Sequence, residues 1–148
     1  MSGQSEAISS IGIKFYRWSA SSNWQQLGDI TGVDGPKKTK ETIDVTPLNT
    51  ADGYRQFISD LKSGGTVGLT MNFVRAMYDL LDLDFEAIAT QNYAIVFPDT
   101  KRTAIEFEGL VLELPITGNV GSQITSNVSI QVSGKPVTSD GSSGAFPE

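Results

Sequence analysis

The sequence predicts a mainly β protein, an antiparallel β-sandwich or barrel-like sheet with one α-helix on its flank. Three observations predict this fold class. Several segments alternate apolar and polar residues with a period of two, as half-buried strands do. One segment has the spacing of an amphipathic helix. A glycine divides a long strand-like segment where its apolar residues change phase, which is typical of a bent sheet.

The clearest strand lies in residues 122–133, where most even positions are apolar and the odd positions are polar. Residues 65–73 repeat the pattern with apolar side chains at the odd positions. Shorter alternations begin at Ile11 and at Tyr93, and Pro98 ends the second one because proline cannot donate to a sheet. These segments predict four strands of an antiparallel sheet.

A further strand-like segment, residues 103–114, changes phase in its middle. Ile105 and Phe107 are apolar at odd positions, whereas Leu110 and the leucines that follow it occupy even positions. Gly109 lies between the two halves. This pattern predicts a β-bulge or strand break at Gly109 that bends the sheet.

Residues 75–89 form the predicted helix. Its apolar residues fall on one stripe, which we expect to pack on the sheet: Met77, Leu80, Leu81, Phe85 and Ile88. Acidic residues lie on the opposite face: Asp79, Asp82 and Glu86. Asn72 is the expected N-cap, and Arg75 is spaced to pair with Asp79 one turn later.

The chain of 148 residues has the size of one domain. We expect a β-sandwich domain over residues 11–134, with no second domain after it. A flexible N-terminal arm over residues 1–10 and a flexible C-terminal tail over residues 135–148 are expected because both ends are rich in Ser and Gly. A long loop is expected at residues 31–42, since its Asp-Gly-Pro run interrupts regular structure and its lysines favour solvent.

Composition excludes many functions. The formal net charge is -6 and the pI is about 4.6, which argues against a protein that neutralises phosphates. The chain has no Cys and no His, so it lacks disulfides, thiolate metal sites and the usual acid–base side chain. We expect no enzyme activity and no cofactor. Without a signal peptide or a long apolar run, the expectation is a soluble protein made in the cytoplasm with no membrane partner.

The remaining catalytic candidates are carboxylates. Glu106 and Glu108 share a strand face and could in principle act as a glycosidase-like pair of carboxylates. Two glutamates so placed are also common on solvated strands, and we interpret them as solvated surface residues. Residues 82–86 echo a calcium loop, yet Ala87 stands where the loop needs glycine. Residues 32–35 lack the Gly-Lys-Ser/Thr of a phosphate-binding loop.

The polar faces of two predicted strands carry no Lys or Arg, although freely solvated sheets usually mix charges of both signs. The residues on these faces are Thr66, Thr70, Asn72, Gln123, Thr125, Asn127, Ser129 and Gln131. Two interpretations stay open. Either the face is committed to a neighbouring subunit or a channel wall, or Thr and Ser are present because they suit strands.

Several short segments, in their order and spacing, resemble the major tail tube proteins of long, non-contractile-tailed bacteriophages. They cover most of the chain: Asp34-Gly35-Pro36, residues 43–48, the turn from Gly53-Tyr54-Arg55 to Phe57, residues 61–73, Phe97-Pro98-Asp99, Phe107-Glu108-Gly109 and residues 132–135. The resemblance implies a β-sandwich with one flanking helix and a structural protein without catalytic activity.

The resemblance also implies hexameric rings that stack into a hollow tube in the virion. DNA passes through such a tube without specific binding, and the implied partners are a tape measure protein and a tail terminator. An acidic protein fits a conduit that must not hold phosphate. Glu106 and Glu108 are the candidates to line the lumen. The candidates for contacts between subunits are the loop residues Asp34, Gly35, Lys37, Lys38 and Lys40.

Two alternatives remain at this stage. One is another tube or tail-terminator component of a phage or a type VI-like apparatus, which would form rings without long tubes. The other is a monomeric β-sandwich binding module. That module would need exposed aromatic residues, and Tyr16, Trp18 and Trp24 are its candidates. We expect these three side chains to be buried or interfacial instead.

Overall fold

The computed structural model describes residues 12–19, 23–27, 30–49, 51–99, 102–141 and 146. These residues form nine strands and one helix. The strands are β1 (Lys14–Trp18), β2 (Trp24–Leu27), β3 (Ile30–Asp34), β4 (Thr39–Asp44), β5 (Phe57–Ser63), β6 (Thr66–Asn72), β7 (Gln91–Val96), β8 (Thr103–Glu113) and β9 (Thr125–Asp140), and the helix is α1 (Arg75–Glu86).

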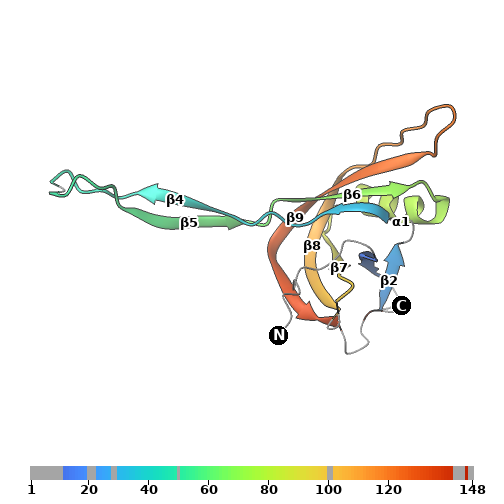
Figure 1. Cartoon of the computed structure of the whole chain (residues 1–148), viewed down its shortest axis with the longest axis horizontal. Coiled ribbons are helices and arrows are strands. Elements are labelled where there is room, and N and C mark those ends of the chain that lie inside the picture. Colours follow the sequence, from blue (N-terminus) through green and yellow to red (C-terminus); the bar gives the residue numbers. More distant parts are fainter. Residues whose placement is uncertain are drawn as a thin grey trace, which may run out of the picture.

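Seven strands form one antiparallel sheet in the order β2-β1-β7-β8-β9-β6-β3. The sheet curves strongly, and its long strands β8 and β9 bend around the body of the molecule (Figure 1). The predicted architecture, mainly β and antiparallel with one flanking helix, is confirmed. The main core lies on the inner face of this sheet, and its buried residues are Phe15, Leu27, Val67, Leu69, Met71, Leu81, Tyr93, Ile95, Phe107, Val111, Val128, Ile130 and Val132.

The other two strands, β4 and β5, pair only with each other and leave the body as a long hairpin (Figure 1). We call residues 39–63 the hairpin arm. The prediction of a loop over residues 31–42 is therefore wrong. β3 and β4 take up most of that range and leave only residues 35–38 between them, because the backbone groups on either side pair with β6 and β5.

The helix packs on the sheet through Met77, Leu80 and Leu81, as predicted. The stripe does not extend further, since Phe85 is 45% exposed and Ile88 is 98% exposed. Ile88 leaves the stripe because α1 ends at Glu86, with an extended residue after it. The last buried position of the helix is Asp84 instead.

The first turn of the helix differs in one detail from the prediction. Val74 is the N-cap and makes no side-chain cap hydrogen bond, whereas Asn72 is the last residue of β6. The predicted pair is present, with Arg75 Nε 3.2 Å from an Asp79 carboxylate oxygen. Both side chains are largely exposed, so this pair contributes little to stability.

The predicted phase change at Gly109 is wrong. Phe107, Gly109 and Val111 are all buried, so the inward phase continues through the glycine. The register with β9 shifts on either side of it, between Glu106 and Glu108 and again after Val111. Glycine is needed at position 109 for a different reason, because a Cβ there would lie 2.5 Å from a methyl carbon of Ile130. The glycine allows β9 to pass close to β8.

The predicted end of the domain at residue 134 is also wrong, because β9 continues to Asp140 and keeps pairing with β8. Phe146 is buried on the outer face of the sheet, with its ring centroid 5.2 Å from that of Tyr16 and 5.2 Å from that of Trp24. The sequence there is rich in Ser and Gly, but one aromatic side chain is enough to complete a second small core. The predicted N-terminal arm, residues 1–10, lies outside the described residues.

Candidate functional site

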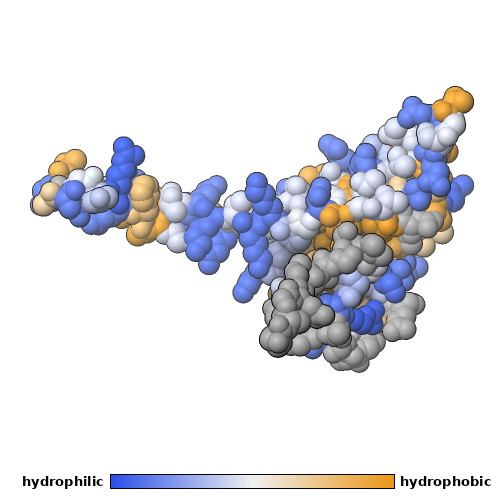
Figure 2. All heavy atoms as spheres, in the orientation of Figure 1, coloured by the Kyte–Doolittle hydropathy of each residue, from blue (hydrophilic) through white to orange (hydrophobic). Residues whose placement is uncertain are grey.

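The hairpin arm is the most conspicuous surface of the molecule. Every residue of β4 and β5 is exposed. Seven of the exposed side chains along the arm are large and apolar: Ile43, Val45, Leu48, Tyr54, Phe57, Ile58 and Leu61. Figure 2 shows hydrophobic residues along the arm out to its far end, with hydrophilic residues between them. An exposed apolar surface of this kind marks a site of interaction with another macromolecule.

The arm carries apolar side chains on both of its faces. Ile43 lies directly opposite Ile58, so these two share one face of the ribbon. Phe57 is adjacent to Ile58 and therefore points to the other face. A two-stranded ribbon by itself is only marginally stable in water. The arm is consequently suited to be enclosed between surfaces of other molecules.

The tip of the arm, residues 45–56, is held by its own hydrogen bonds. The backbone N–H of Thr46 donates to the Asp44 carboxylate at 3.0 Å, and the N–H of Tyr54 donates to that of Asp52 at 3.0 Å. The N–H of Gln56 donates to the Thr46 hydroxyl at 2.8 Å. The bonds from Thr46 hold the pKa of Asp44 below its usual value. The described residues of the tip thus have a defined shape.

Two glycines connect the arm to the body. Gly65 has a φ of +71°, and a Cβ there would lie 2.7 Å from the Lys37 carbonyl oxygen. A Cβ at Gly64 would lie 2.5 Å from Val132 on β9. The Gly65 carbonyl accepts hydrogen bonds from the N–H of Val132 and from the side chain of Gln131, each at 2.9 Å. The direction in which the arm leaves the body is therefore fixed at this point.

The loop residues predicted to contact other subunits lie at the base of the arm but do not form one cluster. Asp34 ends β3 and Gly35 lies in open space. The backbone of Lys37 faces Gly65. Lys38 and Lys40 do come together, in a groove whose nine lining residues are Lys38, Thr39, Lys40, Lys62, Ser63, Gly64, Gly134, Lys135 and Pro136.

Glu106 and Glu108 line a shallow groove of about 410 Å³ on the outer side of β8. Glu106 accepts a hydrogen bond from the Ser139 hydroxyl at 3.0 Å, and Glu108 accepts a longer one from Thr90 at 3.5 Å. Lys135 lines the same groove. No group of three potential metal ligands occurs within the described ranges. The carboxylates are therefore placed as surface charges, and whether they face a lumen stays a prediction.

The uncharged polar residues predicted on two strands share one surface. β6 pairs with β9 in a register that sets Thr66 opposite Gln131, and Thr70 opposite Asn127. These residues point away from the core, because the intervening positions, such as Val67 and Val128, are buried. Gln131 also braces Gly65 at the base of the arm. The outward side chains of this strand pair are therefore uncharged, and Asp34 of β3 and Glu113 of β8, opposite Gly68 and Ser129, border them.

The aromatic residues considered for a binding module pack against one another. Tyr16 is buried, and the rings of Trp18 and Trp24 meet edge to face with centroids 5.1 Å apart. Phe146 covers Tyr16 and Trp24. Tyr16 is buried as expected, whereas Trp18 and Trp24 are half-buried, and their place at an interface stays a prediction. Because the rings of Trp18 and Trp24 meet edge to face, these residues do not form the flat aromatic platform that such a module would need.

Sequence reasoning missed a buried polar cluster between α1 and the sheet. Arg17 donates two hydrogen bonds to the Asp84 carboxylate, at 2.7 and 2.6 Å, and the Tyr93 hydroxyl donates a third at 2.7 Å. The bonds from Arg17 to Asp84 raise the pKa of Arg17, and burial raises the pKa of the Tyr93 hydroxyl. Both groups remain donors at neutral pH. One signal in the sequence pointed to this cluster: Asp84 lies three residues after Leu81, on the apolar stripe of the predicted helix, where a buried residue is expected.

None of the helices among the described residues is long and apolar enough to cross a bilayer. The sequence matches the protein family described as lambda phage tail tube protein over residues 9–139. A comparison with curated proteins finds no match.

The fold is similar to that of several solved structures at low sequence identity. One is the tail of an empty gene transfer agent particle with C6 symmetry, with a TM-score of 0.74 and 13% identity over 90% of this chain and 99% of that chain. A second is the SPP1 tail tube, with a TM-score of 0.70 and 12% identity over 90% and 80%. A third is the sheath/tube terminator of an extracellular contractile injection system, with a TM-score of 0.68 and 7% identity over 91% and 98%.

Proposed function

Because this chain belongs to the lambda phage tail tube protein family, it is a structural protein of the virion's tail tube and not an enzyme, and we propose that its copies close into hexameric rings that stack into a hollow tube. The C6 symmetry of the similar gene transfer agent tail supports six copies per ring. The observation that carries the proposal is the hairpin arm. It is a preformed two-stranded ribbon whose large apolar side chains are exposed in the single chain.

The arm docks on neighbouring copies, in the same ring or in the next one. Its contacts are heterologous, since an arm meets a body rather than a second arm, and contacts of this kind generate rings and stacks. Burying an exposed Leu or Phe side chain contributes roughly 1.5–3 kcal/mol. The seven apolar side chains on each arm, four of them about half exposed, therefore contribute toward offsetting the roughly 4–15 kcal/mol lost in association.

Glu106 and Glu108 are proposed to face the lumen. Their support is the acidic net charge of the chain and the position of both residues in one shallow outer groove. Repulsion between these carboxylates and DNA phosphates would keep the duplex mobile. A tape measure protein in the lumen and a terminator at one end are the further partners that the family implies.

The test is negative-stain electron microscopy of the purified protein over a range of concentrations, alone and with three arm residues changed. We expect wild-type protein to form long tubes of uniform width. Changing Leu48, Tyr54 and Phe57 together to serine is expected to leave a folded monomer, because these side chains touch nothing that the body needs. Circular dichroism provides the folding control.

Isolated rings in the wild-type sample would favour the terminator alternative, and monomers at every concentration would contradict the proposal. Ordinary tubes from the triple variant would contradict the role of the arm. Point substitutions in the arm are used rather than a deletion at its base, because Gly32–Asp34 belong to the body strand β3 and their loss would damage the sheet.

A further inference from the structure

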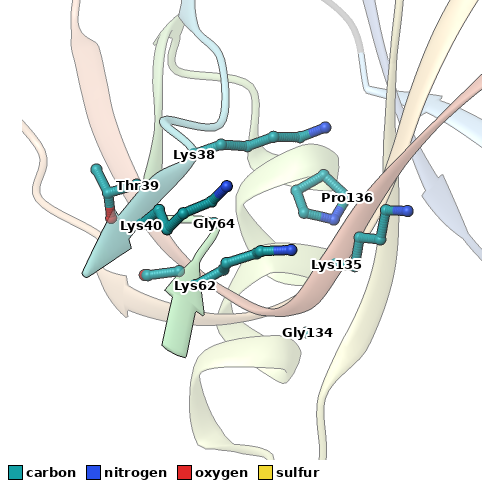
Figure 3. Close-up of a pocket in the computed structure, with 9 residues that line it drawn as sticks. Lys38, Thr39, Lys40, Lys62, Gly64, Gly134, Lys135 and Pro136 are labelled. Atoms are coloured by element: carbon teal, nitrogen blue, oxygen red, sulfur yellow. The ribbon is translucent and has the colours of Figure 1, made fainter. Parts of the chain in front are cut away.

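Four lysines converge where the arm joins the body. Lys38, Lys40 and Lys62 come from the arm side and Lys135 from β9, and together they line a groove of about 650 Å³. We call it the lysine groove. Figure 3 shows the side chains of Lys38, Lys40 and Lys62 extending toward the same side, where Pro136 lies. No acidic residue is among those that line the groove.

The positive charge of this groove contrasts with the negative net charge of the chain. The sequence has 17 acidic and 11 basic side chains, yet four of the basic ones share one groove. Lys40 and Lys62 lie directly opposite each other in the β4–β5 register, and like charges in that position destabilise a sheet. A carboxylate from outside the chain would relieve this repulsion. The groove therefore has the chemistry of a site for an acidic protein segment.

The complementary surface is on α1. Asp82 and Glu86 lie one turn apart on its exposed face, and neither belongs to the ion pairs found among the described residues, Arg17–Asp84 and Arg75–Asp79. Leu83, between them, is 65% exposed. In Figure 1 the arm leaves the body at one end and α1 lies near the other. The two surfaces cannot meet within one copy, but they can meet head to tail between copies.

We propose that the lysine groove of one copy binds the Asp82 and Glu86 carboxylates of a neighbouring copy. This contact rests on the proposed function, and it names the partner surface at the base of the arm. Exposed ion pairs weaken as salt screens them. The contact consequently makes assembly dependent on ionic strength, in addition to the apolar docking of the arm.

The test is charge reversal and compensation, with the critical concentration for tube assembly measured by light scattering and checked by electron microscopy. K40E/K62E and D82K/E86K are each expected to raise the critical concentration about tenfold or more at low salt, because each sets like charges against each other. The variant with all four changes restores opposite charges and is expected to recover most of the loss. K37E is the matched control, since Lys37 is in the same loop but does not line the groove.

Circular dichroism and thermal melting show whether each variant remains folded, as expected for changes at exposed positions. The proposal is overturned if the fourfold variant assembles no better than the two double variants, or if both double variants assemble like wild type. It is also overturned if the groove serves nucleic acid instead, that is, if K40E/K62E abolishes binding of duplex DNA while tube assembly is unchanged. If wild-type protein never forms tubes, the proposed function fails first and this contact fails with it.

Discussion

Asp84 connects the helix to the sheet through three hydrogen bonds that cross the domain. Its carboxylate is almost completely buried, as is most of the Arg17 side chain, with exposures of 6% and 11%. Taking two charges out of water is costly, so such a pair adds less to stability than its geometry suggests. The pair serves instead to position α1, because the hydrogen bonds from the planar guanidinium and from the Tyr93 hydroxyl are directional.

Asp84→Asn is predicted to lower the free energy of unfolding by about 3–5 kcal/mol, because it leaves the buried guanidinium of Arg17 without a counter-charge. The measurement is urea unfolding below the concentration at which tubes form. Asp82→Asn is the matched control on the exposed face of the same helix, with an expected change within about 0.5 kcal/mol. Equal losses in the two variants would show that Asp84 does not hold the helix.

At the scale of elements, the hairpin arm depends on how the chain leaves the body. Gly65 combines a left-handed φ with a close approach to the Lys37 carbonyl, and its own carbonyl is bonded to β9. Only two residues separate β5 from β6, and these contacts set the direction of β5 relative to β6. An arm without a fixed direction would lose entropy on docking, so this junction favours assembly.

Gly65→Ala is predicted to lower the free energy of unfolding by about 1–2 kcal/mol, because a Cβ is strained in the left-handed region and also meets Lys37. We further expect fewer and shorter tubes, since the arm changes direction. Gly35→Ala is the control, because nothing lies within 4 Å of a Cβ at that position. Unchanged assembly of the Gly65 variant would show that the junction does not orient the arm.

The body of the fold could be predicted from the sequence because its strands have one buried face, and burial imposes a period of two. The arm could not, because both of its faces are exposed in the single chain and neither strand alternates simply. Phe57 and Ile58 are adjacent apolar residues, which obscures the pattern of β5. Asp84 was missed for a related reason: its position on the apolar stripe indicates that it is buried, but only its distant partners, Arg17 and Tyr93, explain how a carboxylate is accommodated there.

The candidate site was predictable to the same limited degree. The uncharged residues of β6 and β9 alternate strictly, so their common face follows from the sequence once the two strands are paired. Lys38 and Lys40 were singled out from the loop, whereas Lys62 and Lys135 were not, since they come from segments that are distant in the chain. Sequence spacing does not reveal a cluster that depends on a hairpin folding back to the body.

At the scale of the whole molecule, the chain consists of a compact body and one projecting arm (Figure 1). The body has its own core and needs no partner to bury it. Three surfaces remain available for contacts with other copies: the arm, the uncharged face of β6 and β9, and the lysine groove. Because they lie on different elements of one subunit, they suit an assembly in which every copy has several neighbours.

The most direct test of this account is a cryo-electron microscopy reconstruction of tubes assembled from the wild-type protein. We predict stacked rings of six copies, with both faces of each hairpin arm buried against neighbouring bodies and with Glu106 and Glu108 facing the channel. Tubes in which the arm lies free in solvent would contradict the account, as would subunits that contact one another only through their bodies.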